Sequence, residues 1–155
     1  FYGHSLEPAA EAARRLGVDD VVKIGKPVPY LSSLGLQKAA DILLLLLWDS
    51  PLERGVLTGK IFEYAGAGRP VLSLGCPDGA AAALVRDRRL GLATTDPDRV
   101  REFLVEAAAQ KASKGRVDPP GGPEATVGLS RREQFEALER FLRDHRLLAP
   151  SPARV

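Results

Sequence analysis

The run GKIFEYAGAGRPVLSLG, residues 59–75, constrains the fold more than any other stretch of the chain. Its first part predicts a short helix, with Thr58 as the N-cap and Gly68 as the left-handed residue that ends it. Because Pro70 cannot continue a helix, the apolar residues 71–74 predict a buried strand. The run therefore predicts a helix that turns sharply into a strand.

The residues around this run extend the pattern to an α/β protein. Residues 41–48 are apolar without alternation, which predicts a strand buried on both faces of a parallel sheet. Residues 1–4 resemble the tail of a strand that enters a loop at Gly3, and further strands are predicted at residues 20–24 and 91–94. Helices are predicted at residues 6–16, 31–40, 80–88, 96–110 and 130–148. Strands that alternate with helices predict a doubly wound, Rossmann-like parallel sheet flanked by helices. Such a sheet binds ligands at the carboxyl ends of its strands.

Composition excludes several classes of function. With 45% hydrophobic and 27% charged residues, the 155-residue chain has the composition of one globular domain, and its net charge of +2 is too small to indicate a nucleic-acid partner. A single cysteine, Cys76, excludes an internal disulfide and fits a reducing compartment. His4 and His145 are the only histidines, so no cluster of cysteine or histidine predicts a metal site.

Two segments near the C-terminus have contrasting patterns. Residues 111–128 are rich in glycine and proline without periodicity, which predicts a loop, mobile over residues 113–128. The helix that follows has an apolar stripe of Phe135, Leu138, Phe141 and Leu142. We expect residues 131–138 of this helix to pack on the domain and residues 143–148 to be loosely held.

Two charged residues of the helix at 59–67 have two interpretations. Lys60 lies in its first turn and Glu63 one turn later, so the two side chains can form an ion pair in solvent. A lysine at a helix N-terminus that faces the carboxyl edge of a parallel sheet can instead hold a phosphate. The segment 55–61 is not a P-loop, because it has one residue too few between its glycines and Ile61 after the lysine.

The core pattern KxFEYxxxGRPV, preceded by ADILLLLLWDS, resembles the nucleotide-sugar-binding half of the family 4-type (group 1) glycosyltransferases of the GT-B fold. The resemblance covers residues 1–95 and is weaker in the last helix. It implies the C-terminal, donor-binding domain of a retaining enzyme that transfers a sugar from a nucleotide-diphosphate donor to an unknown acceptor. It also implies a further strand and helix ahead of Phe1, and an N-terminal domain that carries most of the catalytic residues.

The resemblance also implies roles for particular residues. Glu63 would bind the ribose, and the loop Lys26, Pro27 and Val28 would lie against the base. The diphosphate would be bound by Gly55, Val56, Leu57, Thr58, Gly59 and Lys60, where backbone N–H groups and a helix N-terminus stabilise the charge of the leaving group without a metal or another cofactor. A second glutamate of the family corresponds to Gly55 here, so Glu53 is either its substitute at the donor sugar or an exposed loop acid.

We expect residues 1–128 to form the donor domain and residues 129–155 a helix and tail that either cross toward the N-terminal domain or cover this sheet. The expected partners are the sugar donor, an acceptor (glycan, lipid or small molecule) and the N-terminal domain, in the cytoplasm, with peripheral membrane association left open. The alternatives are a non-catalytic nucleotide- or partner-binding module and a sugar-nucleotide epimerase of the same fold.

Overall fold

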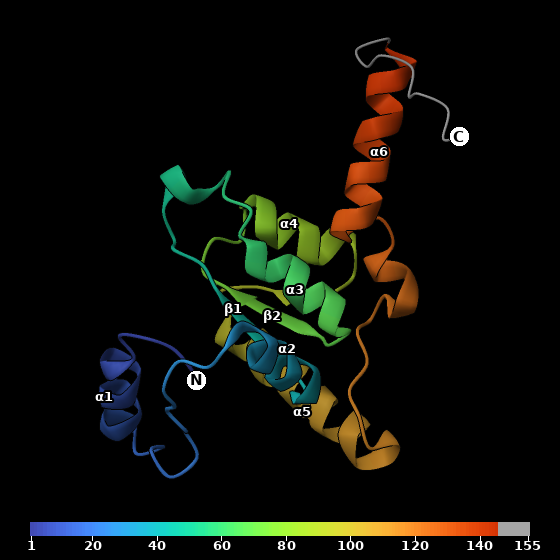
Figure 1. Ribbon diagram of the computed structural model, residues 1–155. Coiled ribbons are helices and arrows are strands. Elements are labelled where there is room, and N and C mark those ends of the chain that lie inside the picture. The colour runs from blue at the N-terminus through green and yellow to red at the C-terminus, as the bar shows by residue number, and fades with distance from the viewer. Residues whose placement is uncertain (146–155) are drawn as a thin grey trace. The chain divides into compact units, whose positions relative to one another are not determined.

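The computed structural model describes residues 1–145, which form two compact units (Figure 1). The first unit is Phe1–Leu36 and the second begins at Gln37. Helix α1 (Glu7–Leu16) belongs to the first unit, and helix α2 (Tyr30–Ala39) spans the boundary. The predicted division near residue 128 concerns the C-terminal helix and stays a prediction.

One parallel bridge joins the start of the first unit to the segment that follows α1. Tyr2 pairs with Gly25, and the N–H of Gly25 donates to the carbonyl of Phe1 at 2.7 Å. A β-carbon on Gly25 would lie 2.5 Å from the Tyr2 ring, so a larger residue there would require the ring to move. The bridged Tyr2, followed by a bend at Gly3, agrees with the predicted strand tail that enters a loop there. The strand predicted at residues 20–24 does not form, so that prediction is wrong.

The segment predicted as the second strand forms a turn. Gly17 ends α1 in the left-handed conformation, with φ 65°. The N–H groups of Val21 and Val22 then both donate to the carbonyl of Val18, at 3.2 and 3.1 Å. Because their backbone donors are used locally, these valines cannot extend a sheet here, whatever their intrinsic β-propensity.

A three-stranded parallel sheet forms the centre of the second unit. Its strands are β1 (Leu43–Leu46), β2 (Val71–Leu74) and β3 (Gly91–Ala93), in the order β1-β2-β3. The other elements are η1 (Pro51–Glu53), α3 (Gly59–Ala67), α4 (Ala80–Asp87), α5 (Pro97–Lys114), η2 (Gly122–Thr126) and α6 (Arg131–Asp144). Helices α3 and α4 cover one face of the sheet and α5 lies on the other (Figure 1). The predicted α/β architecture with a flanked parallel sheet is confirmed.

The core lies between the sheet and the helix pair α3 and α4. Ile61, Val71 and Val85 are fully buried there. Alanines at positions 65, 81 and 82 allow the two helix backbones to lie close to the sheet, because their methyl side chains take up little space. Burying each Val or Ile side chain contributes about 1.5–3 kcal/mol.

Strand β1 is less buried than its sequence predicts. Leu43 and Leu45 are buried, whereas Leu46 is exposed, and Trp48 just beyond the strand is 80% exposed. In the sheet that the structure describes, β1 is an edge strand paired with β2 alone. The prediction of burial on both faces is therefore wrong for β1, and it holds instead for the central strand β2, where Val71, Leu72 and Ser73 are all buried.

Gly75 is needed where the chain leaves β2. Its φ is +113°, and a β-carbon there would lie 2.0 Å from the carbonyl oxygen of Leu47. The N–H of Leu47 donates to the carbonyl of Leu74 at 2.8 Å, so these two segments cannot separate without losing a hydrogen bond of the sheet. Gly66, in α3, is the opposite case, because a β-carbon there meets nothing within 4 Å.

The same substitution at these two glycines should have opposite effects. We expect Gly75→Ala to lower the free energy of unfolding by roughly 2–5 kcal/mol, from backbone strain and overpacking. Gly66→Ala should raise it by about 0.5–1 kcal/mol, because alanine favours the helix. Urea denaturation of the full-length polypeptide measures both, and equal changes in the two variants would contradict this account of the turn.

The segment between α5 and α6 contains more structure than predicted. Helix α5 continues to Lys114 and ends at left-handed Gly115, rather than ending near residue 110. The segment beyond it contains η2, and both Val117 and Ala125 are buried. The sequence did not predict that these two residues are buried, because the surrounding glycines and prolines show no helical or strand periodicity. The mobility of residues 113–128 stays a prediction.

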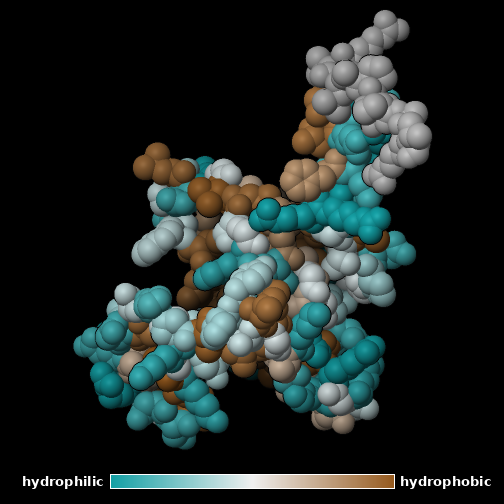
Figure 2. Space-filling model, in the orientation of Figure 1, coloured by the Kyte–Doolittle hydropathy of each residue, from teal (hydrophilic) through white to brown (hydrophobic). Residues whose placement is uncertain are grey.

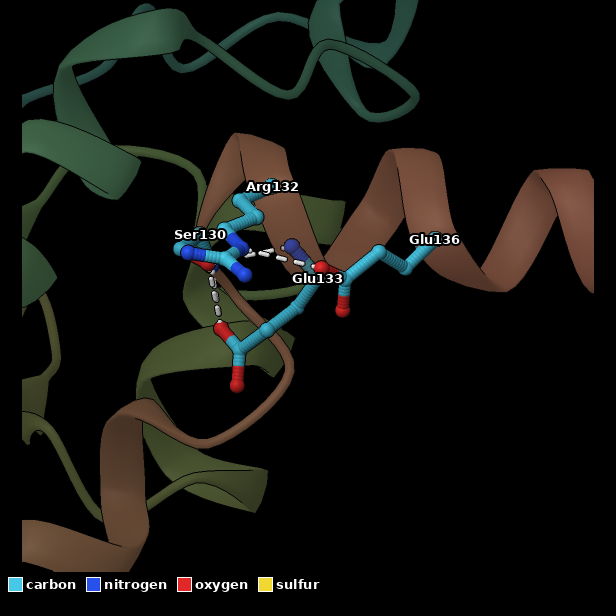
Figure 3. Close-up of polar contacts among 4 residues, drawn as sticks. All are labelled: Ser130, Arg132, Glu133 and Glu136. Carbon is cyan, nitrogen blue, oxygen red and sulfur yellow. Dashed lines mark hydrogen bonds and ion pairs between the residues drawn. The ribbon is translucent and has the colours of Figure 1, made fainter. Parts of the chain in front are cut away.

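Helix α6 begins with a capping box (Figure 3). The Ser130 hydroxyl accepts from the N–H of Glu133 at 3.2 Å, and the Glu133 carboxylate accepts from the N–H of Ser130 at 3.0 Å. The same carboxylate accepts from the N–H of Gly128 at 2.9 Å. Arg132 pairs with Glu136 one turn further on, at 2.9 Å. These contacts determine where the helix starts.

The apolar stripe of α6 is exposed. Phe135, Leu138 and Phe141 are 64%, 50% and 52% exposed, and Figure 1 shows the helix extending away from the sheet. The prediction that residues 131–138 pack on the domain is wrong, since none of the helix residues is buried. Part of the end predicted to be loosely held, residues 146–148, lies outside the described residues.

The cap of α6 predicts a pH dependence. Hydrogen bonds from the Ser130 hydroxyl, and then from the N–H groups of Gly128 and Ser130, lower the pKa of Glu133 below its ordinary value of 4.5. A lowered pKa stabilises the folded state above pH 4.5, and this contribution is lost as the pH falls through the folded pKa. In an NMR titration we expect Ser130→Ala to raise the pKa of Glu133 toward 4.5. An unchanged pKa would contradict the assigned cause.

Candidate functional site

A cavity of about 230 Å³ opens at the carboxyl end of β1. The strand end, the loop after it, and the starts of α3 and α4 contribute its walls, and the lining residues are Leu45, Leu46, Leu47, Trp48, Glu53, Val56, Thr58, Lys60, Cys76, Gly79 and Ala81. All of them belong to the second unit. The carboxyl edge of the sheet is where ligands bind in parallel α/β proteins, so this cavity is the candidate site.

Two helix N-termini meet at the cavity. Helix α3 contributes Lys60 from its first turn, and α4 contributes Ala81 together with its N-cap, Gly79. The N-terminal end of a helix carries a partial positive charge, so both helices favour an anion in this space.

Some of the backbone donors at these helix starts are already used within the protein. The N–H of Lys60 donates to the Thr58 hydroxyl at 3.0 Å, and the N–H of Ala80 donates to the carbonyl of Arg54 at 2.7 Å. The predicted N-cap role of Thr58 is therefore confirmed. An anion at α3 would be attracted by the helix dipole and the ammonium group of Lys60 rather than by the Lys60 N–H.

Half of the predicted diphosphate residues line the cavity. Val56, Thr58 and Lys60 do so, while Gly55, Leu57 and Gly59 are exposed beside them in the same loop and helix start and are not part of the lining. Ser50 shapes this loop, because its hydroxyl accepts from the N–H of Leu52 at 3.3 Å and caps η1. Diphosphate binding by the six residues stays a prediction.

Glu53 lies at the end of η1 and lines the cavity, although the residue as a whole is exposed. Both of its interpretations, a contact to the donor sugar and an exposed loop acid, therefore stay predictions.

Glu63 points to a different neighbour from the one that its spacing suggests. Its carboxylate accepts a hydrogen bond from the side-chain amide of Gln37, with Nε2 and Oε2 3.1 Å apart. Among the described residues no ion pair joins it to Lys60, which differs from the simplest interpretation of their spacing. Glu63 is half-buried on α3 and is not part of the cavity lining. Its role at a ribose stays a prediction.

The residues predicted to lie against the base belong to the first unit. Lys26 and Pro27 are exposed and Val28 is half-buried, in irregular backbone directly after the Tyr2–Gly25 bridge. The base contact stays a prediction for these three residues.

Several residues at or near the site were given no role from the sequence. Trp48 is the last residue of the apolar run, lines the cavity and is exposed. Exposed Leu52, Val56 and Leu57 follow it in the segment before α3, where Figure 2 shows apolar surface at the upper left. Cys76 is buried in the cavity wall. Its position directly after the turn at Gly75 places it at the carboxyl edge of the sheet, because that turn follows the end of β2. Gln37 had no local signal, because it lies 26 residues from Glu63 in sequence.

Two features are absent from the described residues. Residues 1–145 contain no group of three or more His, Cys, Asp or Glu side chains arranged to hold a metal ion. None of the described helices combines the length and the apolar character needed to cross a membrane.

Comparison with known proteins identifies the fold. No family model matches the sequence, and no curated protein matches it. The structure is similar to the crystal structure of WaaG, a glycosyltransferase involved in lipopolysaccharide biosynthesis, with a TM-score of 0.62 and 20% sequence identity. The match covers 90% of this chain and 35% of the WaaG chain, so this chain spans about a third of the length of that protein. The chain therefore has the α/β fold of one Rossmann-like half of a GT-B glycosyltransferase.

Proposed function

We propose that this chain is the donor-binding part of a glycosyltransferase that transfers a sugar from a nucleotide-diphosphate donor to an acceptor. The observation that carries the proposal is the cavity at the carboxyl end of β1, where two helices begin and Lys60 contributes its side chain. The likeness in fold to a glycosyltransferase supports it.

The charge arrangement suits a diphosphate leaving group. A nucleoside diphosphate gains negative charge as the bond to its sugar breaks, and groups that stabilise this charge in the transition state lower the barrier. Lys60 supplies a full positive charge at the cavity, and the starts of α3 and α4 supply partial ones. We assign the diphosphate to this end of the cavity.

The remaining assignments follow the resemblance to the GT-B glycosyltransferases. Glu63, one turn after Lys60 on α3, would bind the ribose hydroxyls, and Glu53 at the cavity wall would contact the donor sugar. Lys26, Pro27 and Val28 would contact the base. Because WaaG is about three times as long as this chain, we expect the acceptor site and most catalytic residues outside it.

The ribose assignment predicts an effect of Glu63→Gln. This variant keeps the size of the side chain but removes the charge, so it should weaken nucleoside-diphosphate binding by the full-length polypeptide by about 1–3 kcal/mol. Isothermal titration calorimetry measures the change, and an unchanged affinity would rule out the assignment.

The diphosphate assignment predicts a ligand-dependent effect of Lys60→Ala. Binding of a nucleoside diphosphate should weaken by about tenfold or more, since a charged hydrogen bond contributes about 1.5–3 kcal/mol. Binding of the free nucleoside should hardly change. Lys114→Ala, at the exposed C-terminal end of α5, is the matched control. Equal losses for both ligands would count against a phosphate contact.

Turnover distinguishes the proposal from its alternatives. The full-length polypeptide should release nucleoside diphosphate from a nucleotide sugar when an acceptor is present. Conversion of the sugar without release of nucleoside diphosphate would indicate an epimerase. Binding without any reaction across a panel of sugar donors and acceptors would indicate a binding module.

A further inference from the structure

We propose that Gln37 is a positioning residue for Glu63, which it holds in the orientation that accepts two adjacent ribose hydroxyls. This inference rests on the proposed function and adds a residue that no motif in the sequence assigns. Its basis is the hydrogen bond between the two side chains, which joins the end of α2 to α3.

The geometry of this contact is specific. The Gln37 amide donates through Nε2 to Oε2 of Glu63 at 3.1 Å, and both residues are half-buried parts of the second unit. An ionised carboxylate only accepts hydrogen bonds, so the amide must present its nitrogen to Glu63. The contact therefore fixes the orientation of both side chains.

Gln37 is unfavourable for the stability of the folded protein. Its Oε1 is buried without a hydrogen-bond partner among the described residues. A buried acceptor without a partner is unfavourable, and an apolar side chain of similar size would avoid it. The amide thus donates a hydrogen bond to Glu63 but leaves its own oxygen unsatisfied. We infer that the residue serves to orient Glu63 rather than to stabilise the fold.

The chemistry of a vicinal diol explains that requirement. Each carboxylate oxygen accepts up to two hydrogen bonds, so Glu63 can accept from Gln37 and still bind both hydroxyls of a ribose. A free glutamate side chain would lose rotamer freedom when it binds, and a carboxylate that is already oriented avoids that loss.

The test compares two substitutions at Gln37 with a matched control. The panel UDP, GDP, ADP and CDP identifies the ribonucleoside diphosphate that the full-length polypeptide binds most tightly, and its 2′,3′-dideoxy analogue is the second ligand. The measured quantity is the affinity for the ribonucleoside diphosphate divided by the affinity for its dideoxy analogue. We expect Gln37→Leu to lower this ratio by about three- to tenfold. Gln37→Glu should lower it further, because it places a second carboxylate beside Glu63. The control is Gln110→Leu, at a half-buried glutamine of α5, which should leave the ratio unchanged.

The outcomes separate this inference from the proposed function. A ratio lost in Glu63→Gln but retained in Gln37→Leu would overturn the positioning role alone. A ratio retained in Glu63→Gln, or no binding of any of the four diphosphates, would overturn the ribose site and this inference with it. If Gln37→Leu weakened both ligands equally and lowered the melting temperature, its role would be structural and the inference would fail.

Discussion

The parallel pairing of β2 with both of its neighbours determines where the groups of the candidate site lie. Because β1 and β2 run in the same direction, the helices that follow them, α3 and α4, both begin at the carboxyl edge of the sheet. This pairing needs close backbone contacts. A β-carbon on Gly91 would lie 2.1 Å from the carbonyl oxygen of Val71, and one on Gly75 would lie 2.0 Å from that of Leu47. Two glycines thus permit the sheet that places the cavity.

The electrostatics of this edge come from few groups. The first donors of α3 and α4 are partly satisfied by Thr58 and Arg54, which stabilises the helix starts. The side chain of Lys60 and the dipoles of the two helices then remain to attract an anion.

Local signals were enough to predict the centre of the second unit. Thr58 as N-cap, Gly68 as the left-handed end of α3, and a buried strand after Pro70 are all correct, because each depends on neighbouring residues only. Predictions that needed distant contacts were less reliable. The apolar run at residues 41–48 does not reveal that β1 is an edge strand, and the stripe of α6 does not reveal that it is exposed. The contact between Gln37 and Glu63 likewise depends on how two helices meet, which no local pattern encodes.

The central claim is that a nucleoside diphosphate binds at the carboxyl edge of the sheet, between the starts of α3 and α4. Backbone NMR chemical shifts of the full-length polypeptide, recorded with and without the nucleoside diphosphate that it binds most tightly, test this most directly. The account predicts that the largest changes fall in residues 53–63 and 76–81. Changes concentrated in α5 or α6 would contradict it, as would the absence of any change at a saturating concentration.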